Sequence, residues 1–214
     1  MQPKLISLGL DTSTSNCGIS IVSGEDVLIE INENIGKKHA ETVITLIQKA
    51  LDFTQLNLSD LNVIGVGVGP GNFTGIRISV AAVRGLSFAL KIPAFGIKRY
   101  EAFCYEQNKD LLCSINASTG QVYVINYCNG TFGSCSLHKL DNLPIPNCDY
   151  IIGDQSEKIS QKLNLIEEKQ IYLPATSIAK MAHKMPSKRS PPKPFYPDTG
   201  IYGTPDVFNS KYKS

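Results

Sequence analysis

Several features that mark common protein classes are missing from this chain of 214 residues. Its 21 lysine and arginine residues nearly balance 19 aspartate and glutamate residues, so the formal net charge is only +2. Proteins that hold a polyanion by charge carry a larger excess, so we do not expect this chain to grip one unaided. Apolar runs also stay short of the roughly 20 residues that cross a membrane, and we expect no membrane contact.

The cysteines and histidines do not form a recognisable metal or disulfide pattern. No two cysteines have Cys-x-x-Cys spacing, and His39, His138 and His183 are scattered, so we predict no metal site. The first apolar run lacks a signal-peptide cleavage pattern, which favours a reduced, cytoplasmic setting. We expect the thiols to be small core residues. The cysteines concerned are Cys17, Cys104, Cys113, Cys128, Cys135 and Cys148.

The most specific segment runs from Val63 to Gly75 and places five glycines and a proline between an apolar run and a helix-like pattern. It predicts a buried strand, a loop of defined backbone shape and the start of a helix. Two interpretations stay open. The amides of Gly71 to Gly75 form an anion site at the helix start, or the glycines only allow a tight turn. A Walker loop is excluded because no Gly-Lys-Ser/Thr follows, and the glycine spacing is not that of a Rossmann fold.

The first hundred residues predict one compact lobe. Short strands joined by tight turns begin the chain as an antiparallel meander, and helices then alternate with further strands. The predicted order is βββαβαβ. Its strands are 4–10, 17–22, 27–31, 63–68 and 92–97, and its helices are 39–53 and 75–90.

A second lobe is predicted from an internal repeat, because residues 111–127 repeat the strand, turn and strand plan of residues 5–22. Further strands are expected at 132–140 and 150–152, and helices at 156–165 and 176–185.

Prolines and basic residues dominate the end of the chain. This segment either contacts phosphates or an acidic partner, or it is a solvated tail without a partner. We expect a solvated tail. The predicted domains are 1–100, 101–186 and 187–214.

The glycine segment also resembles a family signature. Gly69-Pro-Gly-Asn-Phe-Thr-Gly-Ile-Arg-Ile78 is similar to the Gly-Pro-Gly-Ser-Phe-Thr-Gly-Val/Leu-Arg signature of the TsaB (YeaZ-like) family, and Leu8 to Thr14 resembles the family's opening strand and turn. With His39 at a helix start, the resemblance covers roughly residues 5 to 100. It implies an α/β fold of two actin-like, ribonuclease H-like lobes (the ASKHA superfamily) with mixed sheets and a degenerate second lobe.

The resemblance also implies a function. TsaB proteins are noncatalytic partner subunits of TsaD in making the threonylcarbamoyladenosine of tRNA at adenosine 37. It implies TsaD and TsaE as partners, tRNA contact only through the complex, and a homodimer when TsaD is absent. No cofactor is expected to bind tightly, although ATP or ADP with magnesium would fit a partner interface. The alternatives are an active ATP-dependent enzyme, such as a small kinase or a TsaD-like metallo-ATPase, and a glycoprotease.

Asp11 is the first candidate for a nucleotide site, because superfamily ATPases place a carboxylate near metal-bound phosphate at the end of this strand. The alternative is an Asx turn, in which Asp11 bonds to nearby backbone amides. The equivalent position in the second lobe is Asn116, and Val43 stands four residues after His39 where TsaD has a second histidine. We therefore predict no catalytic and no metal-binding residue. The nucleotide-site candidates are Asp11, Thr12, Gly71, Asn72, Thr74 and Gly75.

The helix at 75–90 is apolar almost all round, which predicts burial on more than one side. Either both sides are internal or one side meets a partner, and the resemblance favours a partner. A charge at Val80 or Val83 is then expected to weaken association without unfolding the chain. The predicted interface residues are His39, Val43, Ile47, Ile76, Val80 and Val83.

Overall fold

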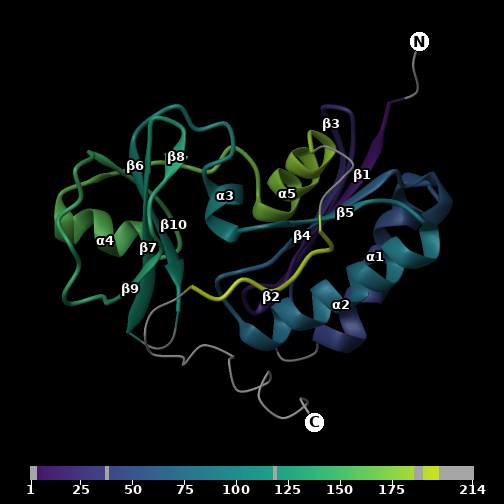
Figure 1. Ribbon diagram of the computed structural model, residues 1–214, viewed down its shortest axis with the longest axis horizontal. Helices are drawn as coiled ribbons and strands as arrows, with labels where there is room; N and C mark the ends of the chain where they lie inside the picture. The colour runs from purple at the N-terminus through teal and green to yellow at the C-terminus, as the bar shows by residue number, and fades with distance from the viewer. Residues whose placement is uncertain (1–3, 37–38, 118–119, 186–189, 198–214) are drawn as a thin grey trace, which may run out of the picture.

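The computed structural model describes residues 4–36, 39–117, 120–185 and 190–197. Two mixed sheets form the cores of two lobes, one of five strands and one of six, with β9 lying off the main path of the second. Figure 1 shows the lobes side by side, with α3 (Arg99–Phe103) and residues 190–197 between them. The predicted two-lobed α/β architecture is confirmed.

The first sheet has the order β3-β2-β1-β4-β5. The antiparallel strands β1, β2 and β3 form the predicted meander, and β4 and β5 run parallel to β1. Parallel neighbours bring their carboxyl ends to one edge. The end of β1 therefore lies beside the loop that follows β4. The elements are β1 (Ile6–Asp11), β2 (Asn16–Ser23), β3 (Asp26–Asn34), α1 (His39–Thr54), β4 (Val63–Gly67), α2 (Phe73–Leu90) and β5 (Ala94–Ile97).

One face of this sheet is covered by α1 and α2 (Figure 1). Leu8 and Leu10 of β1 and Ile64 and Val66 of β4 point to that face and are fully buried. Side chains alternate across a strand, so these residues follow the period of two that the sequence shows. Each buried aliphatic side chain stabilises the lobe by roughly 1.5 to 3 kcal/mol relative to exposure.

The opposite face is covered by α5 (Pro174–His183), which lies against β1, β2 and β4. A Cβ at Gly9 would lie 2.1 Å from the carbonyl oxygen of Ala175, and one at Gly65 would lie 2.7 Å from that of Ile178. Only glycine allows so close an approach. Residues 174–183 were expected in the second lobe, and that placement is wrong, because this helix completes the first lobe instead.

In the second lobe, β6 and β7 form an antiparallel pair like that of β1 and β2, as the internal repeat predicts. The single strand expected at 132–140 is instead two short strands, which pair with different ends of β7. The helix α4 packs on β10, and α3 contacts β6 and β10. The elements are β6 (Leu111–Asn116), β7 (Gln121–Cys128), β8 (Thr131–Phe132), β9 (Ser136–Lys139), β10 (Tyr150–Gly153), α4 (Ser156–Leu163) and β11 (Ile166–Glu167).

Residues 190–197, which follow α5 in the sequence, lie at the boundary between the lobes. The backbone N–H of Phe195 donates to the carbonyl of Val68 at 2.8 Å, and the Phe195 ring packs against the cores of both lobes. Pro192 is buried beside Gly96. The expectation of a solvated tail is therefore wrong for residues 190–197, whereas residues 198–214 lie outside the described part of the chain.

By length and composition, α2 would be able to cross a membrane, since its 18 residues have a mean hydropathy of 1.3. Ile76, Val80 and Val83 are nevertheless buried in the first lobe, and Arg77 and Arg84 lie on the exposed side. This arrangement is typical of a core helix in a globular lobe.

Candidate functional site

The turn after β1 is held by the Asp11 carboxylate. Its Oδ1 accepts the backbone N–H of Ser13 at 3.0 Å and the Ser13 hydroxyl at 2.5 Å. This is the Asx turn that was one of the two interpretations of Asp11. A Cβ at Gly67 of β4 would lie 2.6 Å from Asp11 Oδ1, so the glycine of β4 makes room for the carboxylate.

The glycine loop packs directly on this turn. The N–H of Asn72 donates to the Ser13 carbonyl at 2.7 Å, and the Thr12 hydroxyl donates to the Gly75 carbonyl at 2.9 Å. Gly71 has a φ of 150°, and a Cβ there would lie 2.3 Å from the Ser13 carbonyl oxygen. The loop shape is therefore needed for contact with the chain's own turn.

The start of α2 supplies its own cap. Asn72 Oδ1 accepts the N–H of Thr74 at 3.1 Å and that of Gly75 at 3.0 Å. A side-chain cap of this kind satisfies helix-start donors that an anion would otherwise bind. The geometry favours the tight-turn interpretation over an anion site. The six predicted nucleotide-site residues do meet around one turn, but Asp11, Thr12 and Gly75 are buried behind Gly71, Asn72 and Thr74.

A buried arginine joins this turn to the second lobe. Arg99 begins α3 (Arg99–Phe103), and its backbone N–H donates to the Gly69 carbonyl at 2.8 Å. Its guanidinium forms an ion pair with Asp11 and donates to the Ser13 hydroxyl at 2.8 Å. On the other side it pairs with Asp154 at 3.1 Å. Asp154 Oδ2 in turn accepts the N–H of Asn116 at 3.0 Å.

The charge on Arg99 is secured by these partners. Burial alone lowers the pKa of a guanidinium, but the charges of Asp11 and Asp154 outweigh it and raise the Arg99 pKa.

Sequence reasoning missed both Arg99 and Asp154. Asp154 directly follows β10 and Arg99 lies two residues after the end of β5. Charged residues at the carboxyl ends of strands are typical of functional positions.

A groove of about 570 Å³ lies between the lobes on one side of this cluster. Its described lining is made of hydroxyl, amide, aromatic and apolar groups, with no charged side chain. Polyphosphates are held by cationic side chains, metal ions or free backbone amides. The described lining has no charged side chain, and Asn72 occupies the amides of Thr74 and Gly75, so this part of the groove is poorly suited to one. The lining residues are Ser13, Thr14, Ser15, Gly71, Asn72, Phe73, Asn116, Ala117, Gln121, Tyr123 and Leu137.

On the other side, a cavity of about 140 Å³ is lined by Asp11, Glu30, Arg99, Asp154 and Gln170, among others. Buried Nε of Arg99 and Oε1 of Gln170 have no hydrogen-bond partner among the described residues. The volume is below the roughly 300 Å³ of a typical small-molecule site and suits a few water molecules of about 30 Å³ each.

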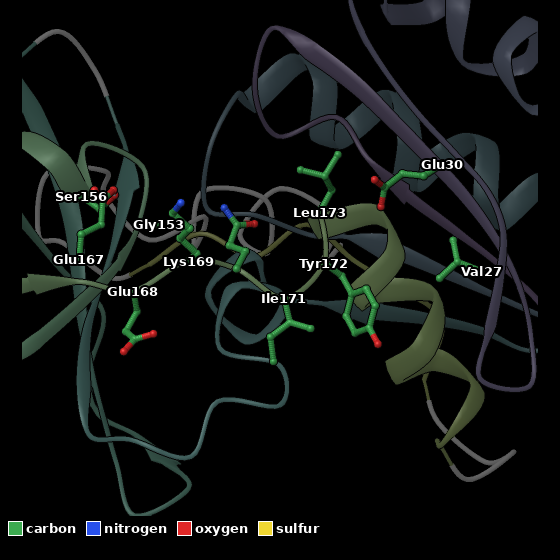
Figure 2. A pocket seen from close by; sticks show the side chains of 11 residues that line it. Val27, Glu30, Gly153, Ser156, Glu167, Glu168, Lys169, Ile171, Tyr172 and Leu173 are labelled. Carbon is green, nitrogen blue, oxygen red and sulfur yellow. The ribbon is translucent and has the colours of Figure 1, made fainter.

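A wider pocket of about 590 Å³ opens beside that cavity, between β3 and the segment before α5 (Figure 2). Figure 2 shows Glu30 on one side of the lining and Glu167 and Glu168 on the other, with Tyr172 between them. The lining has three acidic side chains and one basic side chain, Lys169, so its net charge is negative. A negative net charge disfavours the binding of nucleotide phosphates.

Five of the six predicted interface residues do not lie on the surface. Val43, Ile47, Ile76, Val80 and Val83 are at most 3 % exposed and belong to the first lobe's own core. Their assignment to a partner surface is wrong, because these residues of α1 and α2 belong to the faces that pack into the core of the first lobe. α1 begins at His39, but the His39 side chain is outside the described residues. The exposed residues of the two helices include Ile44, Phe53, Ala81, Gly85 and Phe88, of which Phe88 is 87 % exposed.

Thiol and metal chemistry have little support in the described chain. All six cysteines are free, and Cys17, Cys104 and Cys113 are buried as expected of core residues. Burial raises the pKa of the Cys17 thiol to about 12, with Asp11 and Glu33 adding to the effect. Among the described side chains, no group of three His, Cys, Asp or Glu residues is placed to hold a metal ion.

Comparison with known proteins identifies the family. The model of the family described as "TsaD: tRNA N6-adenosine threonylcarbamoyltransferase" matches residues 30–198. The "tRNA threonylcarbamoyladenosine biosynthesis protein TsaB" of Buchnera aphidicola (Schizaphis graminum) is 32 % identical over 79 % of this chain and 88 % of that protein. The chain belongs to the TsaB branch of this family. The TsaB protein of Escherichia coli is 27 % identical over 56 % of this chain and 54 % of its own length.

Solved structures agree with this TsaB assignment. "YeaZ from Pseudomonas aeruginosa" superposes with a TM-score of 0.68 at 25 % identity, over 83 % of this chain and 90 % of that one. The ethanolamine utilization protein EutJ from Carboxydothermus hydrogenoformans superposes with a TM-score of 0.56 at 10 % identity, over 84 % and 90 % of the two chains. The second likeness concerns the fold alone and agrees with the actin-like ATPase fold.

Proposed function

We propose that this chain is a noncatalytic partner subunit of TsaD in the biosynthesis of tRNA threonylcarbamoyladenosine. Its TsaB relatives carry that biosynthesis in their names, which supports the pathway. The observation that carries the noncatalytic role is the Arg99 cluster, because the carboxylate that would face a metal-bound phosphate is paired internally with an arginine. In this proposal the transfer to adenosine 37 is catalysed by TsaD, and tRNA meets this chain only through the complex.

The surface proposed for TsaD is the exposed side of α1 and α2. Phe88 is almost completely exposed on α2, and Ile44 is 53 % exposed on α1. Large exposed apolar side chains on neighbouring helices are typical of a protein interface. Exposed Ala81 and Gly85 on α2 leave space for a facing helix to approach closely. When TsaD is absent, the same surface joins two copies of this chain.

The isolated chain supplies no complete nucleotide site in this proposal. Asn72 occupies helix-start amides, Arg99 occupies the Asp11 carboxylate, and the described lining of the groove carries no charge. Binding of ATP or ADP with magnesium therefore requires TsaD and TsaE to complete a site. Six free thiols suit a reduced, cytoplasmic compartment.

Reconstitution tests the proposal. Purified TsaD and TsaE from the same source are combined with tRNA and threonylcarbamoyl-adenylate, with and without this chain, and modified adenosine is measured. We expect product formation to depend on the chain, and the chain alone to hydrolyse ATP no faster than a buffer control. Robust magnesium-dependent ATP turnover by the isolated chain would instead favour an ATP-dependent enzyme, and product formation unchanged by omission would exclude the subunit role.

A further inference from the structure

Arg99 is the point at which four segments of the chain meet. Its backbone holds the glycine loop through Gly69, and its guanidinium reaches the β1 turn at Asp11 and Ser13. The same guanidinium reaches Asp154, which follows β10 in the second lobe. Each lobe thus contributes one carboxylate to a single buried cation.

The three charged side chains of this cluster are largely buried. Arg99 and Asp11 are each 7 % exposed, and Asp154 is 16 % exposed. Two carboxylates at such a site repel each other unless a cation lies between them, and removing one partner of a buried ion pair leaves an uncompensated charge. The arginine therefore compensates charge from both lobes.

We propose that Arg99 is a built-in cation that holds the two lobes in one fixed relative position by pairing with one carboxylate from each. The chain then needs no ligand to keep its lobes together. Its surfaces on the two lobes, including the exposed side of α1 and α2, are presented in one geometry at all times. The proposal concerns the isolated chain, so it stands or fails independently of the proposed role with TsaD.

Three further observations agree with a fixed arrangement. Phe195 packs between the cores of both lobes, and its ring meets Tyr100 edge-on at 6.2 Å. The Phe103 ring lies 4.7 Å from the Arg99 guanidinium carbon, a cation–π contact that fixes the side chain from its α3 side. Asp154 is itself positioned by the N–H of Asn116 at 3.0 Å.

The first test removes only the second-lobe partner. Asp154→Ala leaves Arg99 paired with Asp11, and Asp149→Ala is the matched control, since Asp149 is exposed at the other end of β10. We expect Asp154→Ala to lower the thermal midpoint by about 3 to 12 °C, because a charge-assisted hydrogen bond between the lobes is lost, and the control by at most about 2 °C. Small-angle X-ray scattering is expected to show a larger radius of gyration for Asp154→Ala only. A wild-type midpoint and wild-type scattering curve for Asp154→Ala would overturn the proposal.

The second test asks whether Arg99 stands in for a cation. Arg99→Met leaves the two carboxylates uncompensated. Mn²⁺ is therefore expected to raise the thermal midpoint of this variant and to restore its compact scattering curve. In wild type, Mn²⁺ is expected to change neither the midpoint nor the scattering curve. The double variant Arg99→Met, Asp154→Ala is expected to lose the response. A folded Arg99→Met protein with the wild-type response to Mn²⁺ would contradict the cation role. If Arg99→Met does not fold, the Asp154→Ala result decides.

Discussion

Gly9 of β1 and Gly65 of β4 are direct partners in the parallel register, and α5 rests on both of them. Without side chains at this pair, the carbonyl groups of Ala175 and Ile178 come close to the sheet surface. The contact brings a helix from the far end of the sequence onto the first lobe. The glycine segment that begins in β4 therefore has two roles. It allows α5 to pack closely on the sheet, and it forms the loop that follows β4.

Gly9→Ala is expected to destabilise the chain by about 3 kcal/mol or more, because the new methyl group meets backbone atoms that have no rotamer to change. Urea unfolding followed by circular dichroism measures the loss. Gly85→Ala is the control, since a Cβ on this exposed helical glycine meets nothing within 4 Å. It is expected to stabilise α2 by about 0.5 to 1 kcal/mol. Equal midpoints for the two variants would show that α5 does not depend on this glycine pair.

Asn72→Ala removes the cap of α2 and is expected to cost about 1 kcal/mol. The same unfolding measurement applies, with exposed Asn108→Ala as a control that should change stability by less than about 0.5 kcal/mol. Phosphate is expected to leave the wild-type midpoint unchanged, because Asn72 already occupies the amides of Thr74 and Gly75. Clear stabilisation of wild type by phosphate would revive the anion-site interpretation.

Much of the fold follows from local sequence patterns. The order βββαβαβ, the strand pair repeated in the second half and the strand, loop and helix around Gly71 all appear where the periodicity predicts them. These elements depend on contacts with neighbours in sequence. The position of α5 depends instead on Gly9 and Gly65, which lie more than 100 residues from it, and no local pattern reports that contact.

In the candidate site, too, the local contacts could be predicted from the sequence and the long-range contacts could not. The Asx turn of Asp11 is a local structure, and its sequence suggests it. The pairing of Arg99 with Asp11 and Asp154 joins residues 88 and 55 positions apart. For α2, an apolar pattern on nearly all sides identifies a helix but does not distinguish the face that meets the sheet from the face that is open. Val80 and Val83 were therefore predicted on the wrong face, and Phe88 carries the exposed apolar surface.

Thiol titration with a chromogenic disulfide at pH 8 tests the buried cysteines. Burial raises the pKa of Cys17 and of Cys135 to about 12, with Asp11 and Glu33 contributing at Cys17, and raises that of Cys113 well above its usual range. These thiols carry almost no thiolate at pH 8, so they should react only after unfolding. We expect fewer than half of the cysteines to react in the native protein and all of them in urea. Rapid native reaction of Cys17, located by mass spectrometry, would contradict this burial.

The raised pKa of Cys17 also predicts a pH dependence of stability. The unfolded thiol ionises near pH 9 and the folded thiol near pH 12, so its contribution is complete below pH 9 and is lost as the pH rises through this window. The loss amounts to about 1.4 kcal/mol per pH unit for one thiol. Cys17→Ala should therefore show a shallower alkaline decline of the unfolding free energy than wild type. An unchanged slope would argue against the shifted pKa.

Phe195→Ala is expected to destabilise the chain by about 3 kcal/mol, because the ring fills space between both cores. Exposed Lys193→Ala is the control in the same segment and should have an effect below about 0.5 kcal/mol. Thermal unfolding of both variants measures the difference. Equal stability of Phe195→Ala and Lys193→Ala would show that residues 190–197 behave as a solvated tail.

The central claim is that the exposed side of α1 and α2 binds TsaD, and isothermal titration of TsaD into wild type and Phe88→Asp tests it most directly. Ile145→Asp is the matched control, since Ile145 is 92 % exposed in the second lobe. A central interface residue contributes about 2 kcal/mol or more, so Phe88→Asp is predicted to raise the Kd at least about 30-fold. The control should keep the wild-type Kd. A folded Phe88→Asp protein that binds TsaD with wild-type affinity would contradict the account.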